Sequence, residues 1–119
     1  MLESALLRRM HRQPDGLVEA AVAELVRRPE SAVSALSDGL GLSQRHLLRR
    51  FTAAVGYGPR VFGRVMRLRR FLTLMSRHAE RDLTRLAVDA GFADHAHLVH
   101  ECAELTGMTP SALRLRWSS

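Results

Sequence analysis

The feature that most constrains the fold is a pattern of leucine, glycine and proline that occurs twice in the chain. Leu36 and Gly41 recur 50 residues later as Leu86 and Gly91. After a one-residue insertion, three further pairs lie 51 residues apart: Leu47 and Leu98, Gly56 and Gly107, and Pro59 and Pro110. Repeats of this length usually mark a duplicated structural unit. The sequence therefore predicts two copies of one small motif.

The first copy reads as two helices joined by a glycine turn. Ser31 is expected to open a short helix that runs to about Leu40, and Gly41 supplies the backbone freedom for a sharp turn. Ser43 is then a good N-cap for a second helix that continues to Val55. Helix, glycine turn and helix in this order are the pattern of a helix-turn-helix motif.

The second copy carries the same signals. Asp82 is placed to cap a helix over 83–90, and Gly91 marks the turn. Asp94 is placed to cap the next helix, which we expect to end near Thr106, and a last helix is expected to begin at Thr109-Pro110. The fold expected from both copies is all-α.

The helix that follows Ser43 has two chemically different faces. With Leu47 at zero on a helical wheel, Phe51 falls on the same apolar stripe, whereas Arg45 and Arg49 fall on the opposite face. An arginine fork can donate to O6 and N7 of guanine as well as to phosphate. The pattern favours a recognition helix in a DNA major groove; a solvated amphipathic helix is the alternative reading.

Three further helices are expected. The first covers residues 1–11, and the second is capped by Asp15 and ended by Pro29. The third is long, from Pro59 to about Arg77. Its expected apolar arc consists of Val61, Val65, Leu68, Leu72 and Met75. A neighbouring stripe holds Arg60, Arg64 and Arg67; because almost no acids stand nearby, we expect contacts between this stripe and backbone phosphates.

Charge points to an anionic partner. The 119 residues include 18 arginines and no lysine, and the net charge is +6. The segment from Gln44 to Arg81 contains ten arginines and a single acidic residue. No apolar run approaches the length of a membrane span, so no membrane partner is expected. The single cysteine, Cys102, fits a reducing cytoplasm. Double-stranded DNA is the expected partner, and the cytoplasm is the expected location.

The sequence resembles the AraC/XylS family of bacterial transcription regulators over about Leu17 to Trp117. The motifs that carry the likeness are VSALSDGLGLSQRHLLRRF, VGYGP, RVMRLRRF, LTRLAVDAGFADHAHL and LTGMTPSALR. The resemblance implies two helix-turn-helix subdomains joined by a long linker helix, sequence-specific DNA binding and regulation of transcription. It implies that one stretch of major groove faces Gln44, Arg45, Leu48 and Arg49. The next stretch would face His95, Ala96, Val99 and His100, and the expected phosphate contacts are Ser43, Arg50, Arg60, Arg64 and Arg67.

The expected domain limits follow from this likeness. Residues 15–57 form the first helix-turn-helix subdomain, 58–78 the linker helix and 79–119 the second subdomain. Residues 1–14 resemble the end of a removed sensor domain, because relatives often attach this module to one. A sensor domain and RNA polymerase are therefore further expected partners.

The chain departs from the family pattern at two positions. Relatives usually carry Arg where this chain has His100, and Phe where it has Cys102. We expect weaker base reading by the second unit. We also expect Cys102 to be a small core residue that leaves the second unit less well packed, unless Trp117 or Phe92 fills the volume of the missing ring.

Two other functions are weighed against DNA binding. A helical protein-interaction module would retain the fold without binding DNA, but the clustered arginines argue against it. A metal-responsive module is suggested by His95, His97, His100 and Cys102, although His95 and Cys102 point away from the other two on a regular helix. No nucleophile elbow, phosphate loop or HExxH motif is present. We expect no enzyme activity, no metal site and no cofactor.

Overall fold

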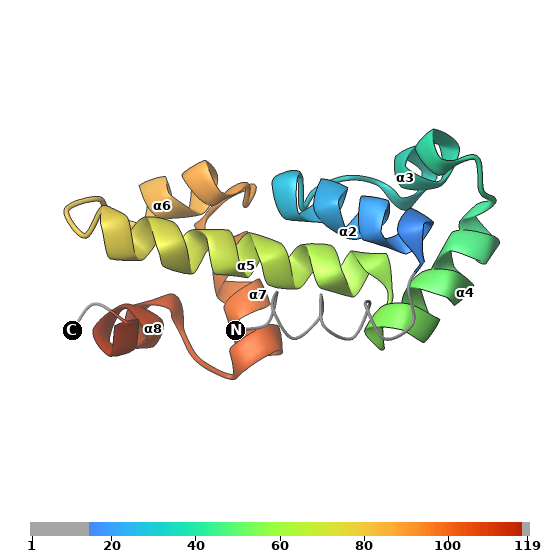
Figure 1. Cartoon of the computed structure of the whole chain (residues 1–119). Helices are drawn as coiled ribbons and strands as arrows, with labels where there is room; N and C mark the ends of the chain where they lie inside the picture. Colours follow the sequence, from blue (N-terminus) through green and yellow to red (C-terminus); the bar gives the residue numbers. More distant parts are fainter. Residues whose placement is uncertain (1–14, 118–119) are drawn as a thin grey trace. The chain divides into compact units, whose positions relative to one another are not determined.

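The structure is a computed structural model that describes residues 15–117 (Figure 1). Within this range it contains seven helices and no strand, so the expected all-α fold is confirmed. The helices are α2 (Gly16–Arg27), α3 (Val33–Leu40), α4 (Gln44–Val55), α5 (Pro59–Arg77), α6 (Leu83–Ala90), α7 (His95–Thr106) and α8 (Pro110–Trp117). The helix expected over residues 1–11 lies outside the described residues. No helix in this range is long and apolar enough to cross a membrane.

The chain divides into two compact units within α5. Unit 1 is Met1–Gly63 and unit 2 is Arg64–Ser119. In unit 1, α2, α3 and α4 contact one another; in unit 2, α7 contacts both α6 and α8. Helix α5 therefore supplies its first turn to unit 1 and its later turns to unit 2.

The helix ends are where the sequence places them, with one exception. Asp15, Ser43, Asp82 and Asp94 each accept a hydrogen bond from a backbone N–H in the first turn of their helix. These side chains satisfy donors that a helix start otherwise leaves unpaired. Gly41, at the turn of the first motif, has φ +69°, a conformation that residues with a Cβ rarely adopt.

The exception is the start of α3, which begins at Val33 and not at Ser31. Its N-cap residue is Ala32, whose side chain makes no capping hydrogen bond. The Ser31 hydroxyl instead donates to the carbonyl oxygen of Arg28 at 2.8 Å, so it closes the turn after α2. The expectation that Ser31 opens this helix is therefore wrong.

The core of unit 1 is built around two aromatic rings. Phe51 of α4 and Phe62 of α5 are fully buried, and their ring centroids lie 5.8 Å apart in an edge-to-face arrangement. Burial of Leu47, Phe51, Ala54 and Val55 confirms the expected apolar face of α4. This packing fixes the opposite face of α4 toward the solvent.

The core of unit 2 joins its four helices around a second ring pair. Phe71 and Phe92 pack edge to face at 6.4 Å. Buried around them are Leu68, Met75, Leu86, Ala87, Ala90, Leu98, Cys102 and Leu113. Phe92 therefore lies in the same core as Cys102, as one of the two expected substitutes for the missing ring, whereas Trp117 is 57% exposed.

The expected apolar arc of α5 is partly wrong. Val61 is 39% exposed, and Val65 is only half-buried. The buried positions are Pro59, Phe62, Gly63, Met66, Leu68, Phe71 and Met75. These positions do not follow one continuous stripe, because the start of the helix packs into unit 1 and its later turns pack into unit 2. A single helical wheel for the whole of α5 therefore averages two environments.

Candidate nucleic-acid interface

The exposed face of α4 carries all four residues predicted to read the first stretch of DNA. Gln44, Arg45, Leu48 and Arg49 are exposed, while Leu47 between them is fully buried. Arg45 and Arg49 form no ion pair with any residue of the part that the structure describes. Leu48 is 41% exposed, as are several other large apolar side chains of the described residues to a similar or greater degree. The face thus combines two available guanidinium groups with one apolar side chain.

The corresponding face of α7 is also exposed but is chemically different. His95, Ala96, Val99 and His100 all face the solvent, and Val99 is 38% exposed. Val99 therefore has the exposure that Leu48 has in unit 1. Where α4 presents two arginines, α7 presents an alanine and a histidine, so its exposed face carries less fixed positive charge.

Arg50 is not available to a ligand in the way that Arg45 and Arg49 are. Its Nε and Nη2 atoms donate to the two carboxylate oxygens of Asp15, at 2.9 and 2.6 Å. The same carboxylate caps α2 by accepting from the backbone of Leu17 and Val18. The hydrogen bond from Arg50 holds the pKa of Asp15 below its usual value, although desolvation opposes this shift.

Arg64 is held by two carboxylates of α7. Its Nε and Nη2 donate to Glu101 at 2.9 and 2.8 Å, and Nη2 also donates to Glu104 at 2.6 Å. Glu101 is only 5% exposed, and its hydrogen bonds with Arg64 lower its pKa against the opposing effect of burial. The premise that the arginine stripe of α5 has almost no acids nearby is wrong for Arg64, because α7 folds back and supplies two.

The other predicted phosphate contacts differ in availability. Ser43 is exposed and its hydroxyl accepts from the backbone of His46, while Arg60 is exposed and forms no ion pair within the described residues. Arg67 is half-buried, with its guanidinium carbon 5.6 Å from the centre of the Phe92 ring, and its buried Nε has no hydrogen-bond partner among the described residues. Arg60 is therefore the most accessible of the three cations expected on the α5 stripe.

The histidines of α7 do not assemble with Cys102. Nδ1 of His97 accepts from the backbone of Ala93 at 3.1 Å, and Nε2 of His100 lies 3.2 Å from a carboxylate oxygen of Glu104. In the described part of the chain, one group of three potential metal ligands comes within 4.8 Å, namely His100, Glu101 and Glu104. Both carboxylates already bind the guanidinium of Arg64, which places a positive charge where a metal ion would have to sit.

Cys102 is a core residue. It is fully buried, and burial, with a smaller effect of the neighbouring Glu101 carboxylate, raises the pKa of its thiol to about 11. At neutral pH the thiol is protonated and therefore a poor nucleophile or metal ligand.

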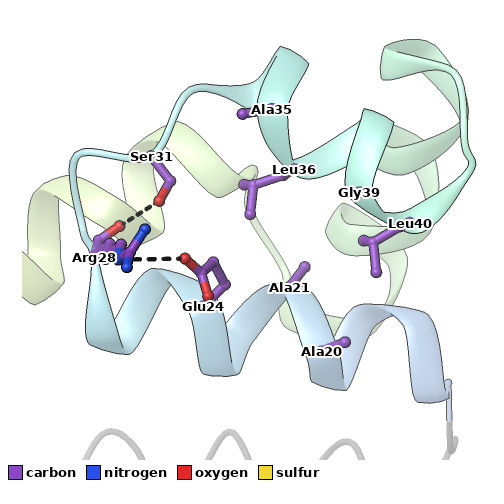
Figure 2. Close-up of a pocket in the computed structure, with 9 residues that line it drawn as sticks. All are labelled: Ala20, Ala21, Glu24, Arg28, Ser31, Ala35, Leu36, Gly39 and Leu40. Carbon is purple, nitrogen blue, oxygen red and sulfur yellow. Dashed lines mark hydrogen bonds and ion pairs between the residues drawn. The ribbon is translucent and has the colours of Figure 1, made fainter.

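A shallow hollow of about 370 Å³ lies between α2 and α3, away from the exposed face of α4 (Figure 2). Ala20, Ala21, Leu36 and Leu40 form its apolar part, and Glu24, Arg28 and Ser31 stand at one end. Figure 2 shows Arg28 directed at Glu24, to which it is joined at 3.8 Å. None of its lining residues belongs to α4, so the hollow is separate from the face predicted to read DNA.

Sequence reasoning missed the three carboxylates that bind Arg50 and Arg64, namely Asp15, Glu101 and Glu104. Asp15 was recognised only as a helix cap, and the two glutamates had no assigned role. A signal was present: Glu101 lies 51 residues after Arg50, so α4 and α7 carry opposite charges at the same repeat position.

Comparison with known proteins agrees with this geometry. The family model described as a helix-turn-helix domain, of the AraC type, matches residues 36–116, which include both glycine turns and both exposed helix faces. Neither the curated proteins nor the solved structures gave a match. Two helix-turn-helix motifs in one all-α chain, together with this match over more than half of its length, show that the chain belongs to the AraC-type helix-turn-helix family of DNA-binding transcription regulators.

Proposed function

We propose that the chain binds double-stranded DNA in a sequence-specific way, with α4 and α7 as its two recognition helices and α4 as the stronger reader. The observation that carries this proposal is the face of α4, where Arg45 and Arg49 stand exposed and unpaired within the described residues. A bidentate arginine contact to guanine is the commonest base-specific contact in the major groove. Leu48 offers an apolar contact of the kind that thymine methyl groups accept.

Helix α7 reads less sequence in this proposal. Its exposed face offers His95, His100 and the apolar Val99, but no arginine. The carboxylate of Glu104 stands 3.2 Å from the His100 ring, and half of the Glu104 side chain is exposed. A carboxylate at this position repels phosphate and competes for the imidazole. Both effects reduce what the second unit adds to affinity.

Phosphate contacts orient the chain on the duplex. The proposed contacts are Ser43, at the N-terminus of α4, and Arg60, with Arg67 as a weaker candidate because its Nε is buried. Helix N-termini favour phosphate because their backbone N–H groups point outward. Arg50 and Arg64 are already bound to carboxylates, so a different role is argued for them below.

Two recognition helices in one chain suit an operator with two unlike half-sites in successive major grooves, roughly 34 Å apart. No palindrome is then needed, and the half-site read by α4 is the richer in guanine. Selection of duplexes from a random pool, followed by footprinting of the selected duplex, measures both features. Binding no tighter than to random competitor DNA contradicts the proposal, as does a symmetric palindrome that only dimers protect.

Salt dependence measures the phosphate contacts separately. Log affinity falls with log salt by roughly 0.9 for each phosphate neutralised. Arg60→Ala should therefore flatten the slope by about one contact and leave the preferred sequence unchanged. Glu30→Gln, a change at an exposed acid outside both recognition helices, is a control for altered net charge. An Arg60→Ala slope equal to that of the parent would place Arg60 away from the DNA.

A further inference from the structure

The two recognition helices share a feature that base reading does not use. Each has 12 residues, and the seventh, Arg50 in α4 and Glu101 in α7, is charged and forms an ion pair with a residue of its own unit. On a helical wheel the seventh position lies about 60° from the fourth, the buried Leu47 or Leu98, and so borders the buried face. Neither residue is well placed to reach a base.

The partners of these two residues lie at nearly the same repeat position: Asp15 caps α2, and Arg64 lies in α5. Helices α2 and α5 end 50 residues apart, at Arg27 and Arg77. Asp15 stands twelve residues before the first of these ends and Arg64 stands thirteen before the second. Both units thus contain the same ion pair, which we call the tether, with its charges exchanged. In unit 1 the acid Asp15 binds the recognition-helix arginine Arg50, and in unit 2 Arg64 binds the recognition-helix acid Glu101.

The contact geometry is also the same in both units. In each, the guanidinium presents its Nε and Nη2 edge to both oxygens of one carboxylate, with the closest contacts between 2.6 and 2.9 Å. A side-on bidentate pair of this kind fixes orientation as well as distance, because two parallel hydrogen bonds resist rotation. Both pairs are half-buried or better, so they are better shielded from solvent than the exposed pairs of α2.

We propose that Arg50 and Glu101 are positioning residues, which set the rotation of each recognition helix about its own axis by a bidentate ion pair with Asp15 or Arg64. The proposal rests on the proposed function, since it concerns helices taken to read bases. Productive site geometry tolerates errors of only about 0.5 Å or 10–20°. A helix held only by apolar packing can turn within that range, whereas one tied at the border of its buried face cannot turn without lengthening both hydrogen bonds.

Unit 1 allows the tether to be separated from helix capping. Asp15→Asn keeps the cap, because Asn is as good an N-cap as Asp. It removes the tether, because an amide has one acceptor oxygen and presents an NH₂ group to the guanidinium. Glu19→Gln is the matched control: it makes the same change in charge in the first turn of α2 and lies outside the ion pair with Arg50.

The measurement is a discrimination ratio, the affinity for a selected duplex divided by the affinity for the same duplex with altered bases in one half. The half read by α4 is the one at which Arg49→Ala loses discrimination. Asp15→Asn should lower the ratio there by at least about fivefold, the smaller end of what one bidentate base contact contributes, and Glu19→Gln should not. Arg50→Lys, which keeps the charge but not the fork, should give the same loss.

If Arg50 instead binds phosphate, the results have the opposite sign. Asp15→Asn would then release Arg50, tighten binding to both duplexes and steepen the salt dependence by about 0.9, with the ratio unchanged. Unit 2 gives the same separation through Arg64→Ala, which should leave the salt slope unchanged if Arg64 only positions α7. A slope reduced by about 0.9 would overturn the proposal for Arg64.

Charge reversal supplies the rescue. Glu101→Gln should lower discrimination in the half read by α7, and Arg64→Glu combined with Glu101→Arg should restore it, because the reversed pair has the polarity that unit 1 already uses. Thermal unfolding followed by circular dichroism checks that each variant is folded. If the parent binds no duplex selectively, the proposed function fails; if the parent discriminates and Asp15→Asn and Glu101→Gln behave like Glu19→Gln, only the positioning role fails.

Discussion

Unit 1 and unit 2 place a large and a small core side chain on different helices. Unit 1 has Ala21 on α2 and Phe51 on α4; at the matching positions unit 2 has Phe71 on α5 and Cys102 on α7. All four side chains are buried. The large and the small side chain have exchanged helices, so each unit has one ring and one small side chain at this pair of positions. Phe71, which the sequence expectation did not name, lies with Phe92 in the same core as Cys102 and supplies a ring where unit 1 has Ala21.

The two units also differ in a contact between a helix and a loop. In unit 1 it joins α5 to the loop after α2, and in unit 2 it joins α8 to the loop after α5. In unit 1, a Cβ on Gly63 would overlap the carbonyl oxygen of Pro29, so the backbones approach closely there. In unit 2, the matching residue is Arg114, whose Nη2 donates to the carbonyl oxygen of Ala79 at 2.7 Å. Pro29 and Ala79 are 50 residues apart. The same backbone carbonyl is therefore contacted in both units, by the backbone at Gly63 in unit 1 and by the guanidinium of Arg114 in unit 2.

The exchange of core volume gives the largest expected effect. Phe71→Ala should destabilise the protein by about 3–5 kcal/mol, because it removes the main ring of unit 2 and leaves a cavity. Cys102→Phe alone should cost about 1–3 kcal/mol by overpacking. The double variant restores the arrangement of unit 1 and should be more stable than Phe71→Ala. Chemical denaturation of all three gives the coupling energy, and strict additivity would mean that the two sites do not share one space.

The difference between the exposed helix faces gives the next effect. Arg49→Ala should cost roughly 1–3 kcal/mol of specific affinity if Arg49 holds a guanine bidentately, and His100→Ala should cost clearly less. Titration of one selected duplex at constant ionic strength compares them. Equal losses would show that α7 reads bases as strongly as α4, and the contrast between the units would then be limited to their cores.

The contact at the shared carbonyl comes third. Gly63→Ala should destabilise unit 1 by about 1–3 kcal/mol, because the new methyl group overlaps a backbone oxygen that cannot turn aside. Arg114→Ala should cost only about 1 kcal/mol, because water can replace much of its hydrogen bonding to the carbonyl oxygens of Ala79 and Arg81. Thermal melting compares the two variants, with Gly39→Ala as a control, since a Cβ at Gly39 meets nothing within 4 Å. A larger loss for Arg114→Ala would reverse the comparison.

The smallest expected effect is the loss of stability at low pH. The pKa of Glu101 is lowered from its ordinary value of 4.5, so the ion pair with Arg64 contributes fully above about pH 4.5 and is lost as pH falls through the lowered pKa. Glu101→Gln should be less stable than the parent by about 1 kcal/mol at pH 7, because Arg64 is partly exposed and the pair is partly screened. The difference should shrink as the pH falls from about 5 to 3. Denaturation curves at several pH values measure it; a constant difference would assign the loss to packing.

Local signals in the sequence predicted the helices well because each lies within a few residues. Asp15, Ser43, Asp82 and Asp94 are caps whose partners are two or three residues away. The error at Ser31 has another cause, because its hydroxyl had two local choices, the start of α3 and the carbonyl oxygen of Arg28. The error at Val61 arises because one helix serves two cores. Partners across the fold were beyond reach: Arg64 and Glu101 are 37 residues apart, and Asp15 and Arg50 are 35 apart.

The predicted base-reading residues were accessible to sequence reasoning for a different reason. A residue opposite a buried stripe is exposed by geometry alone, and Arg45 and Arg49 follow from Leu47 and Phe51. What DNA contact each makes remains a prediction. Availability was harder to foresee, since Arg49 and its neighbour Arg50 look alike in the sequence, and only the fold shows that one of them is bound to Asp15.

The buried thiol gives unit 2 a property that unit 1 lacks. Cys102 is the single cysteine of the chain, it is fully buried, and its raised pKa keeps it protonated at neutral pH. A thiol reagent can therefore react with it only when unit 2 opens, and the labelling rate reports the free energy of that opening. The labelling rate of Cys102 therefore measures the opening of unit 2 alone. Bound DNA that contacts α7 should lower the labelling rate of Cys102, and DNA bound by α4 alone should not.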